Sequence, residues 1–258
     1  MVERTHGLPA LRVPAWETMP NLVHGFLSRR GGVSRGPFAE LNLSHRVGDL
    51  SEAVQENWRR ASAATGGLRC VRMQQVHGDR VVMIDDADGD GGEADAMVTR
   101  TSATVVGVLT ADCVPILLVA PRHHVVAAVH AGWRGALAGI AQRAVQHIEK
   151  AFGTPAAELH AALGPSIGGC CYEVDCSIAD ALEQRWGPLA DTVWRAAGSK
   201  AMIDLRHANA AILERAGVHR TRIVSVGPCT RCTVSEYFSH RAANGPTGRQ
   251  WSFIGWRV

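Results

Sequence analysis

Three residues in separate segments have side chains that could act together in chemistry: His77 in QVHGDRV, Cys113 in TADCVPILL and His130 in VHAGWRG. One thiolate and two imidazoles are a suitable ligand set for Zn²⁺, and three protein ligands leave the fourth position open, as in catalytic zinc sites. Taken singly, each residue has a plainer explanation, because a lone histidine or a reduced cysteine at a strand edge is most often structural. No local ligand pattern links the three, so their spacing leaves both explanations open.

Cys113 has a second possible role as a nucleophile, with His130 as its base and Asp112 or another acid orienting that base. In a regular strand the side chains of Asp112 and Cys113 would point to opposite faces, which argues against Asp112 in this role. A thiolate bound to a metal is also a poorer free nucleophile, so the two roles of Cys113 compete.

A second pair of cysteines, Cys229 and Cys232, lies in the segment PCTRC. This segment matches one half of the zinc nucleobase deaminase signature, and His77-Gly78-Asp79 resembles the other half. The acid is aspartate instead of glutamate, however, and about 150 residues separate the halves, which is far more than those enzymes accommodate. A pair of packed thiols is an equally good explanation.

Cations and a glycine turn near His130 predict a site for an anion. The segment AVHAGWRGALAG runs from a strand into a helix, and the free N–H groups of a first helical turn bind anions. Arg134 adds a guanidinium suited to phosphate. Arg30, beside Gly31, and Arg249, in TGR, are further candidates for substrate binding, although the plainer explanation for each is a solvated or salt-bridged surface residue.

The composition favours a soluble, cytoplasmic protein over several other classes of protein. With 258 residues and 46% hydrophobic residues the chain can bury a large core. Its net charge is only +3, and its arginines are scattered along the sequence and form no basic stripe that would bind nucleic acid. The longest apolar run is interrupted before it reaches the ~18 residues of a membrane span, and the first residues are too polar for a signal peptide. Seven cysteines are best explained as reduced thiols, some of them ligands.

The hydrophobic pattern predicts a single α+β domain with a mixed β-sheet core flanked by helices. Residues 25–44 are expected to form an extended, glycine-turned loop, and the acidic tract 85–95 a solvated loop. Strands are predicted over 80–85, 104–110, 114–120, 124–131, 222–226 and 250–257, and helices over 52–65, 136–152, 177–186 and 205–216.

Six ordered blocks resemble a known family. QVHGDRV, TADCVPILL, VHAGWRG, GPSIGGCCYEV, CTRC and FSHRAANGPTGRQ are similar to the YfiH-like laccase-domain family, whose bacterial members were first called polyphenol oxidases and later purine nucleoside phosphorylases. The resemblance covers roughly residues 25–255. It implies an N-terminal extension over 1–24 and one catalytic domain over 25–258, with a fold like that of cysteine hydrolases. One departure is Ser28-Arg29-Arg30, where a form like STR precedes the glycines, so a substrate contact at Arg30 is less secure.

The resemblance implies that His77, Cys113 and His130 bind a metal, zinc for the purine activity or copper for the oxidase label. It implies phosphorolysis of adenosine and inosine, with methylthioadenosine as a further substrate and adenosine deamination as a second activity. Purine nucleosides and phosphate are then the partners, and the protein would be a monomer or a homodimer. Asp79 and Glu173 are candidates for the proton shuttle.

Two other functions stay open at this point. One is a cysteine hydrolase or deamidase using Cys113 and His130. The other is a copper-dependent polyphenol oxidase, which is disfavoured because the sequence lacks the many His and Met ligands that several coupled copper centres require. The preferred nucleoside and the pathway, whether purine salvage or the editing of cell-wall precursors, are not evident from the residues.

Overall fold

Runs of aliphatic residues in the middle of the chain form strands that are buried on both faces. In the computed structural model, strands β8 (Val114–Ala120) and β9 (Val125–Ala131) are buried at every position. Alternate residues of a strand face opposite sides, so Leu117 packs in one hydrophobic core while Ile116 and Leu118 pack in another. The structure describes residues 2–5, 7–85, 90–188, 192–195 and 198–258.

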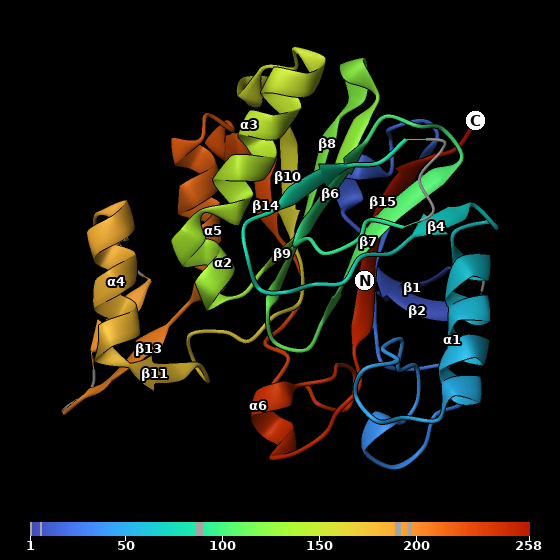
Figure 1. The fold of residues 1–258 in the computed structure, drawn as a ribbon, viewed down its shortest axis with the longest axis horizontal. Helices are drawn as coiled ribbons and strands as arrows, with labels where there is room; N and C mark the ends of the chain where they lie inside the picture. The colour runs from blue at the N-terminus through green and yellow to red at the C-terminus, as the bar shows by residue number, and fades with distance from the viewer. Residues whose placement is uncertain (1, 6, 86–89, 189–191, 196–197) are drawn as a thin grey trace.

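The strands form two six-stranded mixed sheets and one small sheet (Figure 1). The first sheet has the order β1 (Val2–Thr5), β2 (Leu8–Leu11), β3 (Leu22–Leu27), β15 (Gln250–Trp256), β7 (Thr104–Thr110) and β4 (Arg69–Val71). The second has the order β14 (Ile223–Ser225), β10 (His160–Leu163), β8, β9, β6 (Ala96–Thr99) and β5 (Val81–Met83). The small antiparallel sheet contains β11 (Glu173–Asp175), β13 (Lys200–Ile203) and β12 (Val193–Arg195).

The two large sheets pack face to face and helices cover their outer faces. One apolar core, which includes Val106, Leu117 and Ile254, lies between the sheets. Helix α1 (Ser51–Ala64) covers the first sheet, and α2 (Trp133–Ala138), α3 (Ile140–Phe152), α4 (Cys176–Trp186) and α5 (Leu205–Arg215) lie on the side of the second (Figure 1). The short helix α6 (His240–Ala243) lies beyond one end of the sheets. The predicted single domain with a mixed sheet core is therefore confirmed.

Three sequence-based expectations differ from the structure in detail. The predicted helix over 136–152 is two helices, because Gly139 adopts a left-handed φ of +87° that ends α2. The segment 25–44 begins in strand β3 instead of a loop, since Val23, Phe26 and Leu27 pack in the cores. The strand predicted over 80–85 is limited to β5, Val81–Met83.

The N-terminal residues are part of the first sheet. Strand β1 pairs with β2, β2 pairs with β3, and β3 pairs with the C-terminal strand β15. The two ends of the sequence are thus joined by β-sheet hydrogen bonds. Within the part of the chain that the structure describes, no helix has the length and apolar character needed to cross a membrane.

Candidate metal centre

The side chains of His77, Cys113 and His130 meet at one end of the second sheet. Their ligand atoms all lie within 4.8 Å of one another. Strands β8 and β9 are antiparallel neighbours in which Val114 pairs with Ala131 and Pro115 with His130, so Cys113 at the start of β8 lies beside the end of β9. The imidazole of His77 meets that of His130 edge to face, with ring centroids 4.7 Å apart.

A buried carboxylate, Asp95, holds the two histidines in place. It accepts hydrogen bonds from the backbone N–H groups of Val76 (3.2 Å), His77 (3.0 Å) and Gly78 (2.7 Å), which fixes the turn in which His77 has a φ of +60°. One oxygen of Asp95 also lies 2.8 Å from Nδ1 of His130. A carboxylate there keeps a proton on Nδ1, so Nε2 is the nitrogen of His130 that would bind a metal, after releasing its own proton.

The sequence did not indicate this role for Asp95. The tract 85–95 was expected to be a solvated loop, and residues 86–89 lie outside the described part of the chain, but Asp95 is fully buried. Asp95 is buried because β6, which starts at Ala96, pairs with β9 inside the sheet. Its position directly before an apolar strand was the signal available in the sequence.

The electrostatics of the site favour a thiolate on Cys113. Burial alone would raise the pKa of Cys113, but His130 and His77 lower it to about 6. Burial alone would likewise lower the pKa of His130, but the Cys113 thiolate and Asp95 raise it to about 9. At neutral pH the sulfur is therefore available in the form that binds metals or attacks carbon.

The backbone next to the three residues leaves no room for an additional side chain. A Cβ atom on Gly132 would lie 3.0 Å from Sγ of Cys113 and 3.4 Å from Cδ2 of His77. Its φ of −77° is one that any residue can adopt, so the constraint at Gly132 is steric and not conformational. Gly132 allows β9 and α2 to pass close behind the donor atoms.

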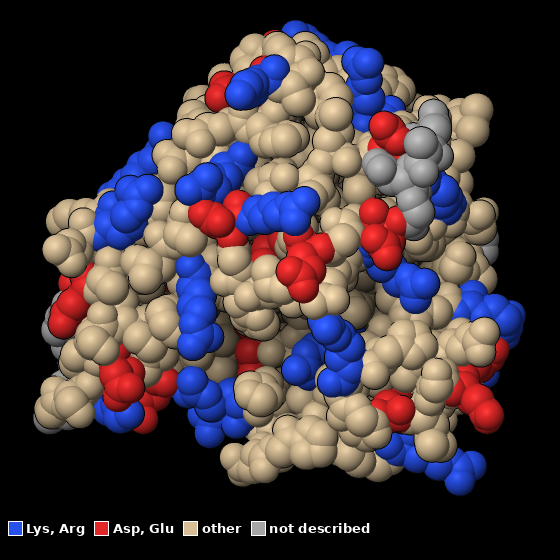
Figure 2. All heavy atoms as spheres, in the orientation of Figure 1, with Lys and Arg blue, Asp and Glu red and all other residues tan. Residues whose placement is uncertain are grey.

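A pocket of about 350 Å³ opens onto the three side chains, a size within the range of small-molecule sites. Its polar lining also includes Ser44, Arg46, Gln75, Thr110, His240 and Arg249. Within the described residues, the buried hydroxyl oxygen of Thr110 has no hydrogen-bond partner. Figure 2 shows Lys and Arg side chains around a hollow in this face, in the region between α2 and α6 of Figure 1.

The three arginines predicted to bind substrate lie in different surroundings. Arg249 is half-buried in the pocket wall, where its Nη1 donates to the carbonyl groups of Thr247 and Gly248. Arg30 lies outside the pocket lining and pairs with the carboxylates of Glu40 (3.1 Å) and Glu236 (3.5 Å). Arg134 is exposed, also outside the lining, and its guanidinium lies over the ring of Trp133 at 4.5 Å.

The acids considered as partners or proton shuttles do not line the pocket. Asp112 accepts hydrogen bonds from Thr230 Oγ1 (2.6 Å) and from the backbone N–H of Arg241 (2.7 Å), so it does not orient His130. Asp79 forms an ion pair with Arg143, and Glu173 is an exposed residue of β11. Neither Asp79 nor Glu173 lines the pocket.

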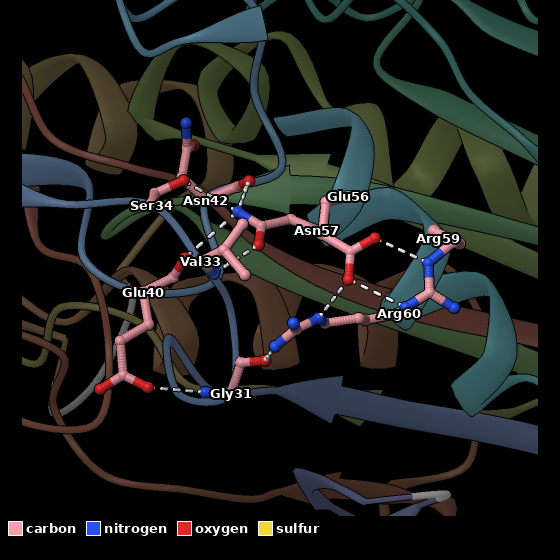
Figure 3. A network of polar contacts seen from close by, with 9 residues as sticks. All are labelled: Gly31, Val33, Ser34, Glu40, Asn42, Glu56, Asn57, Arg59 and Arg60. Atoms are coloured by element: carbon pink, nitrogen blue, oxygen red, sulfur yellow. Dashed lines mark hydrogen bonds and ion pairs between the residues drawn. The ribbon is translucent and has the colours of Figure 1, made fainter. Parts of the chain in front are cut away.

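A buried polar network joins Asn57 of α1 to the segment that contains Val33, Glu40 and Asn42 (Figure 3). Asn57 of α1 donates to the carbonyl groups of Glu40 (3.1 Å) and Asn42 (2.8 Å) and accepts from the N–H of Val33. The side-chain oxygen of Asn42 in turn accepts from the N–H groups of Ser44 and Arg249, each at 3.0 Å. Asn57 thereby fixes the loop that carries three of the pocket residues, Ser44, Arg46 and Val47, a role that the sequence did not reveal.

The cysteines of the PCTRC segment do not join His77. Cys229 and Cys232 form a separate group with Cys170 and Cys171. The resemblance to the nucleobase deaminase signature is therefore not supported, because its two halves contribute to different clusters.

The comparisons with known proteins identify the family. The family model for the multi-copper polyphenol oxidoreductase laccase matches residues 23–257, nearly the whole chain. The protein belongs to this laccase-domain family. Its fold is also that of a solved member: the crystal structure of YlmD from Geobacillus stearothermophilus superposes with a TM-score of 0.91 at 33% identity, covering 99% of this chain and 98% of that one.

Curated relatives in the family are named as enzymes of nucleosides. The sequence of YlmD itself, called a purine nucleoside phosphorylase, is 36% identical over 91% of this chain and 90% of its own length. A purine nucleoside phosphorylase of Deinococcus radiodurans is 40% identical over 96% of this chain and 93% of its own. A relative from an unknown prokaryotic organism, 38% identical over 90% of this chain and 93% of its own, is named adenosine deaminase RL5.

Proposed function

We propose that the protein is a metal-dependent purine nucleoside phosphorylase that cleaves adenosine and inosine with phosphate. Relatives of 36% and 40% identity that carry this name support the reaction, and they match nearly the whole chain. The observation that carries the proposal is that His77, Cys113 and His130 share one small pocket with Arg249. The pocket therefore combines soft metal donors with a cation for an anionic substrate.

His77, Cys113 and His130 would hold the metal. This set of one sulfur and two nitrogen donors suits Zn²⁺ better than it suits hard cations, which prefer oxygen ligands. Copper is the alternative. The Asp95 carboxylate on Nδ1 of His130 fits this proposal, because histidines that bind metals usually donate their second N–H to a carboxylate or carbonyl group. A zinc ion bound there would supply a Lewis acid that polarises an oxygen atom of the substrate.

The protein's own residues would bind and orient the two substrates. Arg249, with the nearby Arg46, provides positive charge for phosphate, and the partnerless hydroxyl of Thr110 offers a hydrogen bond to the nucleoside. A phosphate oxygen forms the new bond to C1′ of ribose as the C1′–N9 bond breaks. The electron pair of that bond leaves with the purine, which takes up a proton. The guanidinium of Arg249 is partly fixed in advance by its hydrogen bonds to the carbonyl groups of Thr247 and Gly248, so little side-chain freedom is lost on binding.

Two finer features belong to the same proposal. Methylthioadenosine, which has the same adenine and ribose rings, would be a further substrate. Hydrolytic deamination of adenosine would be a second activity, supported by the relative named adenosine deaminase. In that reaction water adds at C6 and ammonia leaves, so phosphate is not required.

The test measures metal content together with phosphate-dependent release of hypoxanthine from inosine. Untagged wild-type protein should contain metal and should release hypoxanthine only when phosphate is present. Cys113→Ala should lose both this metal and the release of hypoxanthine. Cys176→Ser is the matched control, because Cys176 is a free cysteine of α4 outside the pocket and should keep both. A fully active wild-type protein without metal at this site would contradict the proposal.

A cysteine hydrolase is the second candidate function, and one observation favours it. Cys113, His130 and Asp95 follow the order nucleophile, base and orienting acid, with a thiolate favoured on Cys113. The expected likeness to cysteine hydrolases belongs to this candidate. Stoichiometric alkylation of Cys113 in metal-free protein, with turnover of an amide or ester substrate, would support it against the phosphorylase.

A further inference from the structure

Four cysteines outside the pocket lie close together at the ends of two neighbouring strands. Strands β10 and β14 run parallel, with Leu163 beside Ser225, so the loops that follow them leave the second sheet at the same edge. The first loop carries Cys170 and Cys171, and the second carries Cys229 and Cys232. All four sulfur atoms lie within 4.8 Å of one another.

Backbone contacts hold the two loops in register. Ser166 and Cys229 form a parallel bridge beyond the strand ends, and the N–H of Thr230 donates to the carbonyl of Ser166 at 3.0 Å. The N–H of Gly168 donates to Sγ of Cys229 at 3.2 Å. The cluster is therefore part of a built structure and not a chance meeting of exposed side chains.

The separations of the sulfur atoms suit one tetrahedral metal ion. Sγ of Cys232 lies 3.8 Å from that of Cys170 and 3.4 Å from that of Cys171. Four thiolates at a Zn–S distance of ~2.3 Å would be about 3.8 Å apart at the corners of a tetrahedron. These sulfur separations are too long for a disulfide, whose S–S bond is about 2.05 Å.

Ordinary packing does not explain these cysteines. A free cysteine is usually a small buried hydrophobic residue, but Cys170 and Cys232 are exposed. Two of the four thiols are exposed and the other two are half-buried, so the cluster buries little apolar surface. Metal binding explains both the exposure and the convergence.

We propose that Cys170, Cys171, Cys229 and Cys232 bind one zinc ion in a closed, four-thiolate site that is separate from the pocket. The four thiols release their protons to solvent as the zinc binds. With four protein ligands the ion has no open position, so its role is structural.

The position of this site gives it a definite task. Thr230, inside the Cys229–Cys232 turn, donates its hydroxyl to Asp112 at 2.6 Å, and Ile167, in the other loop, donates its N–H to the carbonyl of Asp112 at 2.9 Å. Asp112 precedes Cys113 and has a φ of +92°, so these contacts hold a costly backbone conformation beside the pocket. Zinc in the four-cysteine site would therefore stabilise the loops that position Cys113.

The first experiment measures zinc by mass spectrometry in untagged protein purified under reducing conditions. Cys232→Ser should lose one zinc per chain and unfold at a lower temperature than the wild type, whereas Cys176→Ser should lose none. Zinc content that is unchanged in Cys232→Ser would overturn the proposal. A Cys171–Cys232 disulfide found by non-reducing peptide mapping of freshly purified protein would also overturn it, as would copper bound in place of zinc.

A second experiment does not depend on a variant of the cluster that folds. Co²⁺ reconstituted into Cys113→Ala should give the intense sulfur-to-cobalt charge-transfer absorption and visible bands of a tetrahedral four-thiolate site. This variant lacks the thiol of the pocket, so the signal reports the cluster alone, even if the proposed phosphorylase activity is wrong. Absence of the charge-transfer absorption in folded Cys113→Ala would overturn the four-thiolate site.

Discussion

The described part of the chain contains two clusters of potential metal ligands, and they differ in what surrounds them. His77, Cys113 and His130 face a pocket, and a buried carboxylate fixes the imidazole of His130 from behind. The four-cysteine cluster is closed by its own thiols and lies at the surface, where backbone bridges connect its two loops. A metal site with an open coordination position beside a pocket is typical of catalysis, and a site closed by four thiolates is typical of a structural role. The four-cysteine cluster therefore serves as an internal reference for changes made in the pocket.

The largest effect is expected when His130 is removed. His130→Ala should abolish phosphorolysis and leave Asp95 as a buried carboxylate without its charged partner, a change that typically costs about 3–5 kcal/mol. His77→Ala should abolish activity as well, but with little loss of stability, because His77 is exposed. Denaturant unfolding and the inosine assay check this. Equal stability of the two variants would contradict the role of Asp95 and His130 as a buried pair.

The next effect concerns the carboxylate behind the ligand. Asp95→Asn should weaken metal binding in the pocket by about 10- to 100-fold, the range typical for partners of metal-binding histidines. The zinc of the four-cysteine cluster should be unaffected, since no contact of Asp95 reaches it among the described residues. Competition with a chelator of known affinity measures both. If the metal affinities of both sites fell together, Asp95 would act on the fold as a whole.

A smaller effect, on the KM for phosphate, should distinguish Arg249 from Arg30. Arg249→Met should raise the KM for phosphate about tenfold, because a hydrogen bond to a charged group contributes about 1.5 kcal/mol or more. Arg30→Met should change it less than about twofold, since Arg30 is already paired with Glu40 and Glu236 and exposed pairs contribute little. Initial rates over a range of phosphate concentrations distinguish these results, and an equal rise in both variants would place phosphate outside the pocket.

The smallest effect is expected at Thr110. Thr110→Val removes a buried hydroxyl that has no partner among the described residues, so stability should stay the same or rise slightly. The KM for inosine should rise about three- to tenfold if the nucleoside uses this hydroxyl, as one neutral hydrogen bond contributes about 0.5–1.5 kcal/mol. A loss of stability with an unchanged KM would show that the hydroxyl has a structural partner instead.

The longest strands of the two large sheets could be predicted because they carry their own signal, whereas shorter ones such as β4, β6 and β10 were not predicted. β8 is a continuous apolar run, and the bounds of β7, β8 and β15 all agree closely with the sequence-based ranges. The break at Gly139 could not be predicted, because AGIA fits a continuous helix as well as an interrupted one. There the packing of Trp186 against Gly139 accompanies the turn.

The parts of the site that depend on the type of a single residue could be predicted. The parts that depend on which strands pair could not. His77, Cys113 and His130 stood out by residue type, and their convergence was a hypothesis that the geometry supports. Asp95 became visible only with the pairing of β6 and β9, because its sequence neighbours are acidic and glycine-rich. The meeting of Cys170 with Cys232 depends on the parallel pairing of β10 and β14, two strands about 60 residues apart in the chain.

Gln75 illustrates a further consequence of the way this pocket is built. Its side-chain amide donates to the carbonyl of Leu109 and accepts from the N–H of Leu109, each at 2.8 Å, as a neighbouring strand would. Strand β4 covers one edge of β7 only as far as Val106, so the hydrogen-bonding groups on that edge beyond Val106 would otherwise be unpaired, while the opposite edge pairs with β15. An open strand edge is a template for self-association. In the pocket wall, Gln75 thus occupies hydrogen-bonding groups that a strand of another chain would need for pairing at this edge.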